Sequence, residues 1–168
     1  IVVGAVLIFI FEYSNPATIK EMSLFDKLQV SVFQSVTTRT AGFASVPQEN
    51  LTDATSVISL LLMVIGGSPV GTAGGIKTVT VVVLFATAIS TIRNKSSATV
   101  FGRKISDASI RKAVAVVAAF MTICVASTVL LMATNEISAL DAVYETVSAT
   151  ATVGLSRDLT PSLNLFGR

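Results

Sequence analysis

The chain has 168 residues, of which 52% are hydrophobic and 13% are charged, and it contains neither His nor Trp. This composition is typical of a membrane protein and excludes an ordinary soluble domain. A net charge of +2 is too small to indicate a nucleic-acid partner, and the lack of His excludes His-based catalysis or metal ligation. The single cysteine, Cys124, excludes an internal disulfide and is expected to be an apolar structural residue.

An uncharged apolar run opens the chain at residues 1–11. No charged segment precedes it and no cleavage motif follows it, so it does not resemble a signal peptide. We expect residues 1–13 to be the end of a membrane-spanning helix whose beginning is missing.

A short capped helix is predicted within residues 14–53. Ser23 and Asp26 have the spacing of a capping box, in which the serine oxygen accepts an amide hydrogen bond at the helix start. The predicted helix, residues 24–36, would be about 20 Å long, which is too short to cross a bilayer core. It leads into the first Thr/Gly segment, which consists of Thr38, Arg39, Thr40, Ala41 and Gly42.

Residues 54–92 form a long apolar stretch with a glycine-rich interruption at residues 66–78. One helix of that length would be about twice as long as the bilayer core is thick, and glycine and proline break helices. We therefore predict a helix, an intramembrane loop and a second helix. The candidate functional residues of this loop are Gly66, Gly67, Ser68, Gly71, Gly74, Gly75 and Lys77.

Lys77, at the end of this loop, allows more than one interpretation. A lysine at membrane depth is costly, so it should face the interior of a helix bundle or a watery cavity; alternatively, it extends to the membrane interface. Glycines followed by Lys77 and Thr78 also resemble a phosphate-binding loop, which would indicate nucleotide hydrolysis. Ile76 separates Gly75 from Lys77, so the required G-x-x-x-x-G-K-[ST] spacing is not met. We expect transport and not enzymatic turnover.

A basic connection follows at residues 93–112, where the only acid is Asp107. By the positive-inside rule it should face the cytoplasm. Residues 12–53, with five acids and three bases, should face outward, and the uncharged residues 113–134 are long enough to cross the membrane again. The bases of the connection are Arg93, Lys95, Arg103, Lys104, Arg111 and Lys112.

Residues 135–160 repeat the pattern of the first capped helix, on the same outer side. Ser138 and Asp141 form a second capping box, and the predicted helix covers residues 138–149. We expect Asp141 to act as a cap residue and Glu145 to be a solvated charge of the outer vestibule. The second Thr/Gly segment consists of Thr150, Ala151, Thr152, Val153 and Gly154, and an outer segment of residues 161–168 follows it.

Each half-length helix with its Thr/Gly segment is typical of a re-entrant pore loop. Irregular backbone persists at membrane depth only where protein or a water-filled path satisfies its polar groups. Glycine lets successive carbonyls point one way, and such carbonyls can replace the hydration shell of a monovalent cation. The alternative is a pair of ordinary Thr-rich interfacial turns. We predict an all-α membrane protein with re-entrant half-helices and extended filter strands, in which the glycine-rich loop lies under the filters and obstructs the pore.

Three stretches, in this order, resemble the Trk/Ktr/HKT superfamily of potassium transporters. Residues 33–43, beginning Phe33-Gln34-Ser35-Val36, are similar to its third pore loop. Residues 66–78 are similar to its intramembrane gating loop, and residues 144–156, beginning Tyr144-Glu145, to its fourth pore loop. The resemblance covers essentially the whole chain and is closest to the bacterial Ktr-type membrane subunit.

This resemblance implies a part of a pore built from four M1–pore loop–M2 repeats. Residues 1–13 would end the third M1, residues 54–92 would be the third M2, and residues 113–134 would be the fourth M1. The first two repeats and the fourth M2 would be missing, so this piece should not conduct ions alone. Potassium would be held by backbone carbonyls of both Thr/Gly segments, with sodium as a possible coupling ion and no bound cofactor.

The resemblance also implies partners and a location. The family's membrane subunits form dimers in the plasma (inner) membrane and are controlled by a cytoplasmic nucleotide-binding regulatory subunit, which the basic connection could contact; anionic lipid is the alternative contact. Two other functions stay open: a channel-like subunit of a potassium-pumping ATPase, and a non-conducting structural or assembly protein. Arg39 should point behind its filter strand, because a cation facing the ion path would oppose permeation. There it would pair with a carboxylate or be solvated.

Overall fold

The computed structural model describes residues 1–67, 74–94, 97–100, 102–160 and 163. Their main elements are helices, which confirms the predicted helical class. In chain order the elements are α1 (Val2–Glu12), α2 (Leu24–Thr37), the 3-10 helix η1 (Gln48–Asn50), α3 (Asp53–Val64), α4 (Thr78–Ile92), β1 (Thr99–Val100), β2 (Arg103–Lys104), α5 (Asp107–Thr134) and α6 (Ala139–Thr150).

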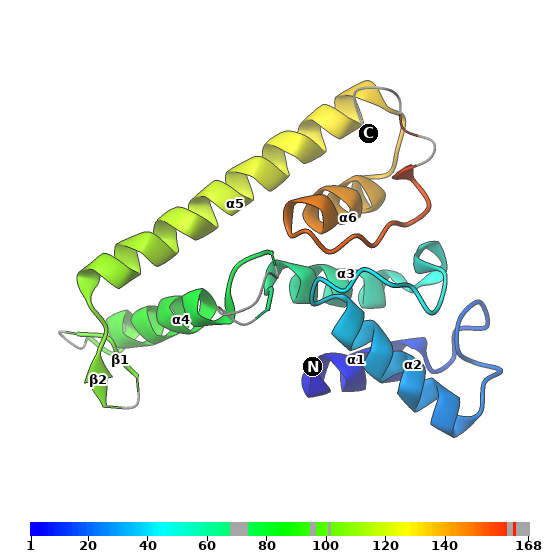
Figure 1. The fold of residues 1–168 in the computed structure, drawn as a ribbon, viewed down its shortest axis with the longest axis horizontal. Coiled ribbons are helices and arrows are strands. Elements are labelled where there is room, and N and C mark those ends of the chain that lie inside the picture. Colours follow the sequence, from blue (N-terminus) through cyan, green and yellow to red (C-terminus); the bar gives the residue numbers. More distant parts are fainter. Residues whose placement is uncertain (68–73, 95–96, 101, 161–162, 164–168) are drawn as a thin grey trace.

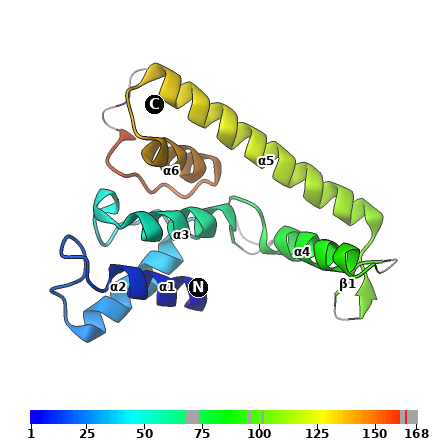
Figure 2. The same cartoon turned by 180° about the vertical axis from the view of Figure 1, so that it is seen from behind.

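Helices α3 and α4 lie roughly in line, and α5 starts beside α4 and diverges from α3 along its length (Figure 1). Helix α6 lies between α5 and α3, whereas α1 packs on the opposite side of α3 and α2 packs on α1 (Figure 2). Both Thr/Gly segments therefore belong to the half of the molecule that contains α3. The other half contains α4, the β1–β2 hairpin and the start of α5.

Both predicted capping boxes are confirmed. The amide of Asp26 donates to the Ser23 hydroxyl oxygen over 3.2 Å, and that hydroxyl donates to the Asp26 carboxylate over 2.7 Å. The amide of Asp141 donates to Ser138 over 3.1 Å, with the same return bond of 2.7 Å. Each cap satisfies an orphan amide and places a carboxylate at the positive end of its helix, so α2 and α6 begin where the sequence predicts.

The predicted break in the long apolar stretch is also confirmed, since α3 ends at Val64 and α4 begins at Thr78. A parallel bridge joins Ile65 to Ile76: the Ile76 amide donates to the Val64 carbonyl over 2.9 Å, and the Gly66 amide donates to the Ile76 carbonyl over 3.0 Å. We call residues 65–67 and 74–76 the neck of the glycine-rich loop. Ser68 and Gly71, two predicted loop residues, lie outside the described residues.

The basic connection contains local structure that the sequence does not indicate. It contains an antiparallel hairpin, in which Thr99 pairs with Lys104 and Val100 pairs with Arg103. Helix α5 then begins at Asp107, because Ser106 caps it by accepting the Ser109 amide. Its first turns therefore include Arg111 and Lys112, which the sequence assigns to the connection. Within the described part of the chain, α5 is the one helix long and apolar enough to cross a membrane.

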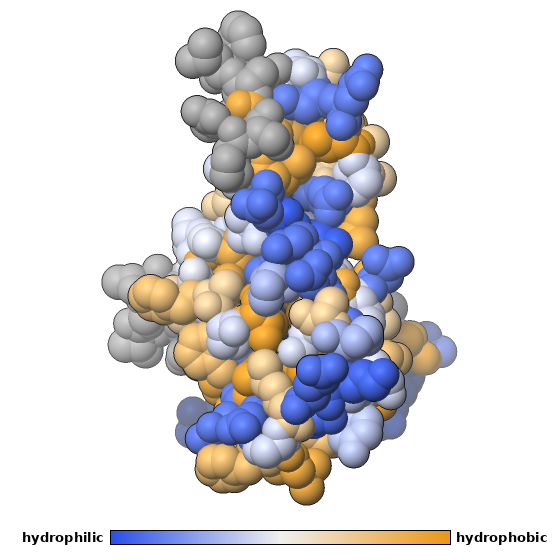
Figure 3. Space-filling model, turned by 90° about the vertical axis from the view of Figure 1, so that its right-hand side faces the viewer, coloured by the Kyte–Doolittle hydropathy of each residue, from blue (hydrophilic) through white to orange (hydrophobic). Residues whose placement is uncertain are grey.

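A buried carboxylate holds the ends of α1 and α3 together. Glu12 is 1% exposed, and it accepts hydrogen bonds from the side chains of Asn15 and Thr18 and from the amide and hydroxyl of Thr52. Thr52 is the N-cap of α3, so this cluster fixes the angle at which the two helices meet. Viewed from this end, hydrophilic side chains form a band with apolar side chains beside it (Figure 3).

Candidate ion-conduction site

The first Thr/Gly segment folds back onto the end of α2. Thr38 is the C-cap of α2, with helical angles (φ −63°, ψ −10°). The amides of Ala41 and Gly42 both donate to the carbonyl of Thr37, over 3.1 and 3.3 Å. Thr40 and Gly42 have positive φ values of 68° and 75°, whereas Ala41 between them does not. The sign of φ thus alternates along this backbone.

The second Thr/Gly segment has the same backbone pattern at the end of α6. The amide of Thr152 donates to the Ala149 carbonyl over 3.0 Å, and the amide of Val153 donates to the Ser148 carbonyl over 2.8 Å. Thr152 and Gly154 have positive φ values of 54° and 88°, whereas Val153 does not. The two copies therefore share their alternation at matching positions.

These bonds fix the direction of several carbonyl groups. In a planar trans peptide the N–H and the preceding C=O point to opposite sides. Because the amides of Ala41, Gly42, Thr152 and Val153 turn toward helix ends, the preceding carbonyls point away from those helices. The oxygens so oriented belong to Thr40, Ala41, Ala151 and Thr152.

The predicted extended filter strands are wrong in conformation. Thr38 is a helix C-cap and Thr150 is the last residue of α6, so both lie in helical geometry, and the residues after them form tight turns. The reason is that their amides satisfy the carbonyls at the helix ends, which a fully extended strand would leave without partners. The sequence pattern shows where glycine is needed but carries no sign of this closure.

The two Thr/Gly segments lie against each other. A Cβ atom built on Gly42 would overlap the Val153 carbonyl oxygen and lie 3.5 Å from the Gly154 Cα. A Cβ atom on Gly154 would lie 3.8 Å from the Gly42 Cα and meet nothing closer. Residues more than 100 positions apart in sequence are thus brought into backbone contact, and Gly42 is the position that permits it.

The neck of the glycine-rich loop touches both segments. Nη1 of Arg39 donates to the Gly66 carbonyl over 3.4 Å. A Cβ atom on Gly74 would overlap the Thr152 hydroxyl and the Ala151 carbonyl oxygen, so the neck packs directly against the second segment at this glycine. The predicted loop and the predicted filters are therefore adjacent in space.

Neither expectation for Arg39 matches its surroundings. Its side chain is half-buried rather than solvated, and its Nε is buried without a hydrogen-bond partner among the described residues. Its contact is a backbone carbonyl and not a carboxylate. Lys77 is the N-cap residue of α4 and is half-buried.

The exit of the first segment is held locally. The hydroxyl of Thr37 accepts from the Phe43 amide over 2.9 Å and donates to the Phe43 carbonyl over 2.6 Å. One side chain at the end of α2 thus closes a turn around Gly42. Phe43 itself is 71% exposed.

The exit of the second segment is held by carboxylates of α6, which corrects the prediction of a solvated Glu145. Glu145 accepts from the Ser156 hydroxyl over 2.5 Å and from the Arg157 amide over 3.0 Å. Asp141 caps α6 and also accepts from Nε of Arg157 over 2.7 Å. The guanidinium further donates to the Ser56 hydroxyl, which connects this exit to α3.

Sequence reasoning missed Arg157 and a second buried cluster, formed by Gln34, Gln48 and Tyr144. The side chains of this cluster are 1%, 2% and 0% exposed and bond to one another between α2, η1 and α6. Gln34 and Tyr144 lie within motifs noticed in the sequence, but Gln48 stands in an unremarkable polar turn. No local pattern indicates that these three residues meet.

No group of three or more Cys, Asp or Glu side chains suited to a metal ion occurs in the part of the chain that the structure describes. The polar atoms available for a cation around the Thr/Gly segments are instead backbone carbonyls and threonine hydroxyls. Oxygen ligands of this kind suit a weakly held monovalent cation that must also leave.

The chain is similar to known cation transport proteins. The cation transport protein family TrkH matches residues 1–167. The chain is 40% identical over 166 residues to the Ktr system potassium uptake protein B of Bacillus subtilis, covering 99% of this chain and 37% of that protein. It is 34% identical over 168 residues to the Ktr system potassium uptake protein B of Vibrio alginolyticus, covering 100% of this chain and 37% of that protein. It is 31% identical over 172 residues to the potassium/sodium uptake protein NtpJ of Enterococcus hirae, covering 100% of this chain and 38% of that protein.

The chain thus spans somewhat over a third of the length of these curated relatives. The match nevertheless includes both capped half-helices, both Thr/Gly segments and the neck of the glycine-rich loop. The chain belongs to the TrkH family of cation transport proteins.

Proposed function

We propose that this chain contributes two of the walls of a potassium-conducting pore, with the two Thr/Gly segments as parts of its selectivity filter. The observation that carries the proposal is the paired backbone alternation, with positive φ at Thr40 and Gly42 and again at Thr152 and Gly154. Such alternation lets neighbouring carbonyls turn toward one side, which an ordinary strand or helix does not allow. A row of such oxygens can replace the hydration shell of a potassium ion.

The ends of α2 and α6 favour a cation at the same place. Each helix terminates directly at a Thr/Gly segment, so the partial negative charge of its C-terminus is directed there. No lysine or arginine lies in the last turn of either helix to cancel that charge. Arg39 follows α2, and its guanidinium is engaged by the Gly66 carbonyl.

The glycine-rich loop is proposed as the gate of this pore. Two contacts of its neck support this assignment: the Gly66 carbonyl accepts from Arg39, and Gly74 packs against Ala151 and Thr152. The loop therefore begins and ends beside the proposed filter residues. An element in this position can obstruct ions that leave the filter toward α4. We take the α4 side, with the basic connection, as cytoplasmic and the end shown in Figure 3 as external.

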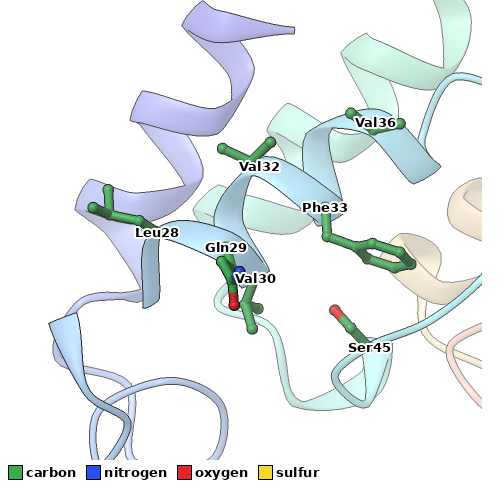
Figure 4. Close-up of a pocket in the computed structure, with 7 residues that line it drawn as sticks. All are labelled: Leu28, Gln29, Val30, Val32, Phe33, Val36 and Ser45. Carbon is green, nitrogen blue, oxygen red and sulfur yellow. The ribbon is translucent and has the colours of Figure 1, made fainter. Parts of the chain in front are cut away.

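Other parts of the pore are proposed to cover the free side of α2. A groove on this side is lined largely by apolar side chains (Figure 4), among which Leu28, Val32, Phe33 and Val36 are between 41% and 48% exposed. The first Thr/Gly segment lies at the end of the same helix and has Ala41 exposed. Two filter segments cannot surround an ion, so further repeats of the same kind are the natural neighbours. Dimer formation and a cytoplasmic regulatory subunit are proposed by family resemblance.

The test is potassium uptake by a potassium-deficient host that produces the full-length protein with Gly42→Asp or Gly154→Asp. Each substitution places a carboxylate side chain on a residue with positive φ inside the filter, and uptake should be lost while the protein still reaches the membrane. Gly102→Asp is the matched control, because Gly102 has φ 75° but nothing within 4 Å of a Cβ atom. Normal uptake by both filter variants would refute the assignment.

A further inference from the structure

We propose that Gln48 sets the spacing of the two filter segments and is thereby a positioning residue for ion selectivity. This inference rests on the proposed function of the Thr/Gly segments. The inference is based on the buried cluster of Gln34, Gln48 and Tyr144, which joins the two half-helices α2 and α6. Gln48 itself belongs to η1, the turn that follows the first segment.

The amide of Gln48 is fully used by its neighbours. Its Oε1 accepts from Nε2 of Gln34 over 2.5 Å and from the hydroxyl of Tyr144 over 3.0 Å. Its Nε2 donates to Oε1 of Gln34 over 3.2 Å and to the Val46 carbonyl over 2.7 Å. A side-chain amide offers two donor hydrogens and two acceptor lone pairs, so Gln48 has no capacity left. Such a saturated buried network tolerates little displacement of its members.

Each end of the cluster leads directly to a filter segment. The backbone carbonyl of Gln34 accepts the amide of Thr38, the first residue of the first segment, over 3.3 Å. Tyr144 lies one helical turn before Ser148, whose carbonyl accepts the amide of Val153 in the second segment. A single oxygen, Oε1 of Gln48, therefore connects the supports of both segments.

A second contact fixes the ring of Tyr144 from outside. The guanidinium of Arg157 lies 5.8 Å from the centre of that ring, and Nη2 of Arg157 donates to the Glu49 carbonyl over 3.4 Å. Glu49 is the neighbour of Gln48 in η1. The tyrosine is thus held at its hydroxyl by Gln48 and at its face by Arg157.

Loss of this cluster should change the selectivity of the filter for potassium over sodium. A filter distinguishes potassium from sodium through the size of its cavity or the number and strength of its carbonyl dipoles, and both depend on how far apart the segments lie. Removing the Tyr144 hydroxyl leaves the ring in place and leaves Gln48 Oε1 bonded to Gln34. Only the link between the half-helices is broken.

The experiment compares potassium and sodium fluxes of the full-length protein in liposomes for wild type, Tyr144→Phe and Gln48→Met. Tyr144→Phe should lower the potassium-to-sodium flux ratio about fivefold, the factor that corresponds to one hydrogen bond of ordinary net strength. In the Gln48→Met background, adding Tyr144→Phe should change the ratio no further, because the acceptor is already gone.

Tyr13→Phe is the matched control, since Tyr13 is the other tyrosine of the chain and is 47% exposed. Its flux ratio should equal that of wild type. An unchanged ratio in Tyr144→Phe would overturn the inference, and so would an equal further loss in the Gln48→Met background. If Gln48→Met does not assemble, the comparison of Tyr144→Phe with Tyr13→Phe decides alone. Absence of potassium flux in wild type would instead refute the proposed function.

Discussion

The two Thr/Gly segments share a backbone and differ in almost everything that supports it. The first ends in exposed side chains, with Phe43 71% exposed, whereas Val153 and Leu155 of the second copy are 3% exposed and belong to the core between α3, α5 and α6. The first exit is closed by one hydroxyl from its own helix, and the second by a carboxylate and arginine network.

This difference shows that the backbone alternation does not depend on one particular environment. What the copies have in common is a capped half-helix, glycine at the fifth position and amides that return to the helix end. Local chemistry therefore produces the turn, and tertiary contacts decide how firmly each copy is held. The following experiments separate these two contributions.

The largest difference in potassium uptake is expected between the variants Gly42→Ala and Gly154→Ala. Both glycines have positive φ, which costs a residue with a Cβ roughly 1–2 kcal/mol, but only at Gly42 would the new methyl group overlap a backbone oxygen. Potassium uptake by the full-length protein should fall at least about tenfold in Gly42→Ala and about threefold in Gly154→Ala. Gly102→Ala, with similar φ and open space, serves as the control and should keep normal uptake. Equal losses at both filter positions would contradict the proposed crowding.

Arg157→Gln should destabilise the second segment by about 2 kcal/mol, between the values for exposed and buried ion pairs. The arginine side chain is 9% exposed, and its loss removes the ion pair with Asp141 and the hydrogen bond to Ser56. The measurement is the unfolding temperature of the full-length protein in detergent.

Arg157→Lys should recover only part of that loss, because lysine cannot reproduce the forked donors of a guanidinium. Arg103→Gln, on the exposed hairpin, should leave the unfolding temperature unchanged. A temperature for Arg157→Gln equal to that of Arg103→Gln would show that the network does not hold the segment.

A smaller difference, in cation leak, is expected between two variants that weaken the contacts of the neck. Gly74→Ala would force the neck away from Thr152, whereas Arg39→Gln would remove one long hydrogen bond to Gly66. If the loop is the gate, cation leak should rise in both variants, by about tenfold and about threefold respectively. Flux from liposomes measures this, with Gly102→Ala and Arg103→Gln as controls. A decrease or no change in both variants would exclude the loop as an obstruction.

Thr37→Val should have the smallest effect, about 1 kcal/mol of stability, because it removes the hydroxyl that bonds to both polar groups of Phe43. Thr37→Ser keeps the hydroxyl and should behave as wild type in the same unfolding measurement. The second copy has Ala149 at the corresponding position and provides no such bond. Identical unfolding of the serine and valine variants would show that the local clamp contributes nothing.

Much of the local structure could be predicted from the sequence, because its causes lie within a few residues. Ser23 with Asp26 and Ser138 with Asp141 determine where two helices begin, and the glycines after Val64 determine where another ends. Family membership follows from the same motifs. The conformation of the Thr/Gly segments was less predictable, since it depends on which carbonyls their amides reach.

The supporting contacts could not be predicted, because they join residues far apart in the chain. Tyr144 meets Gln48 and Arg157 meets Ser56 across separations of 96 and 101 positions. Arg39 contacts a backbone carbonyl, which every residue has, so no residue type marks its partner. Polar side chains such as Gln48 are common in surface turns, and this one is buried where it meets Gln34 of α2 and Tyr144 of α6.

The parallel bridge between Ile65 and Ile76 has a consequence for engineering. Because the chain leaves and returns at one point, the hydrogen bonds at that point fix how α3 and α4 are joined, whatever the length of the peptide between Gly67 and Gly74. The relative placement of α3 and α4 should therefore depend on this bridge and change little when residues between Gly67 and Gly74 are substituted.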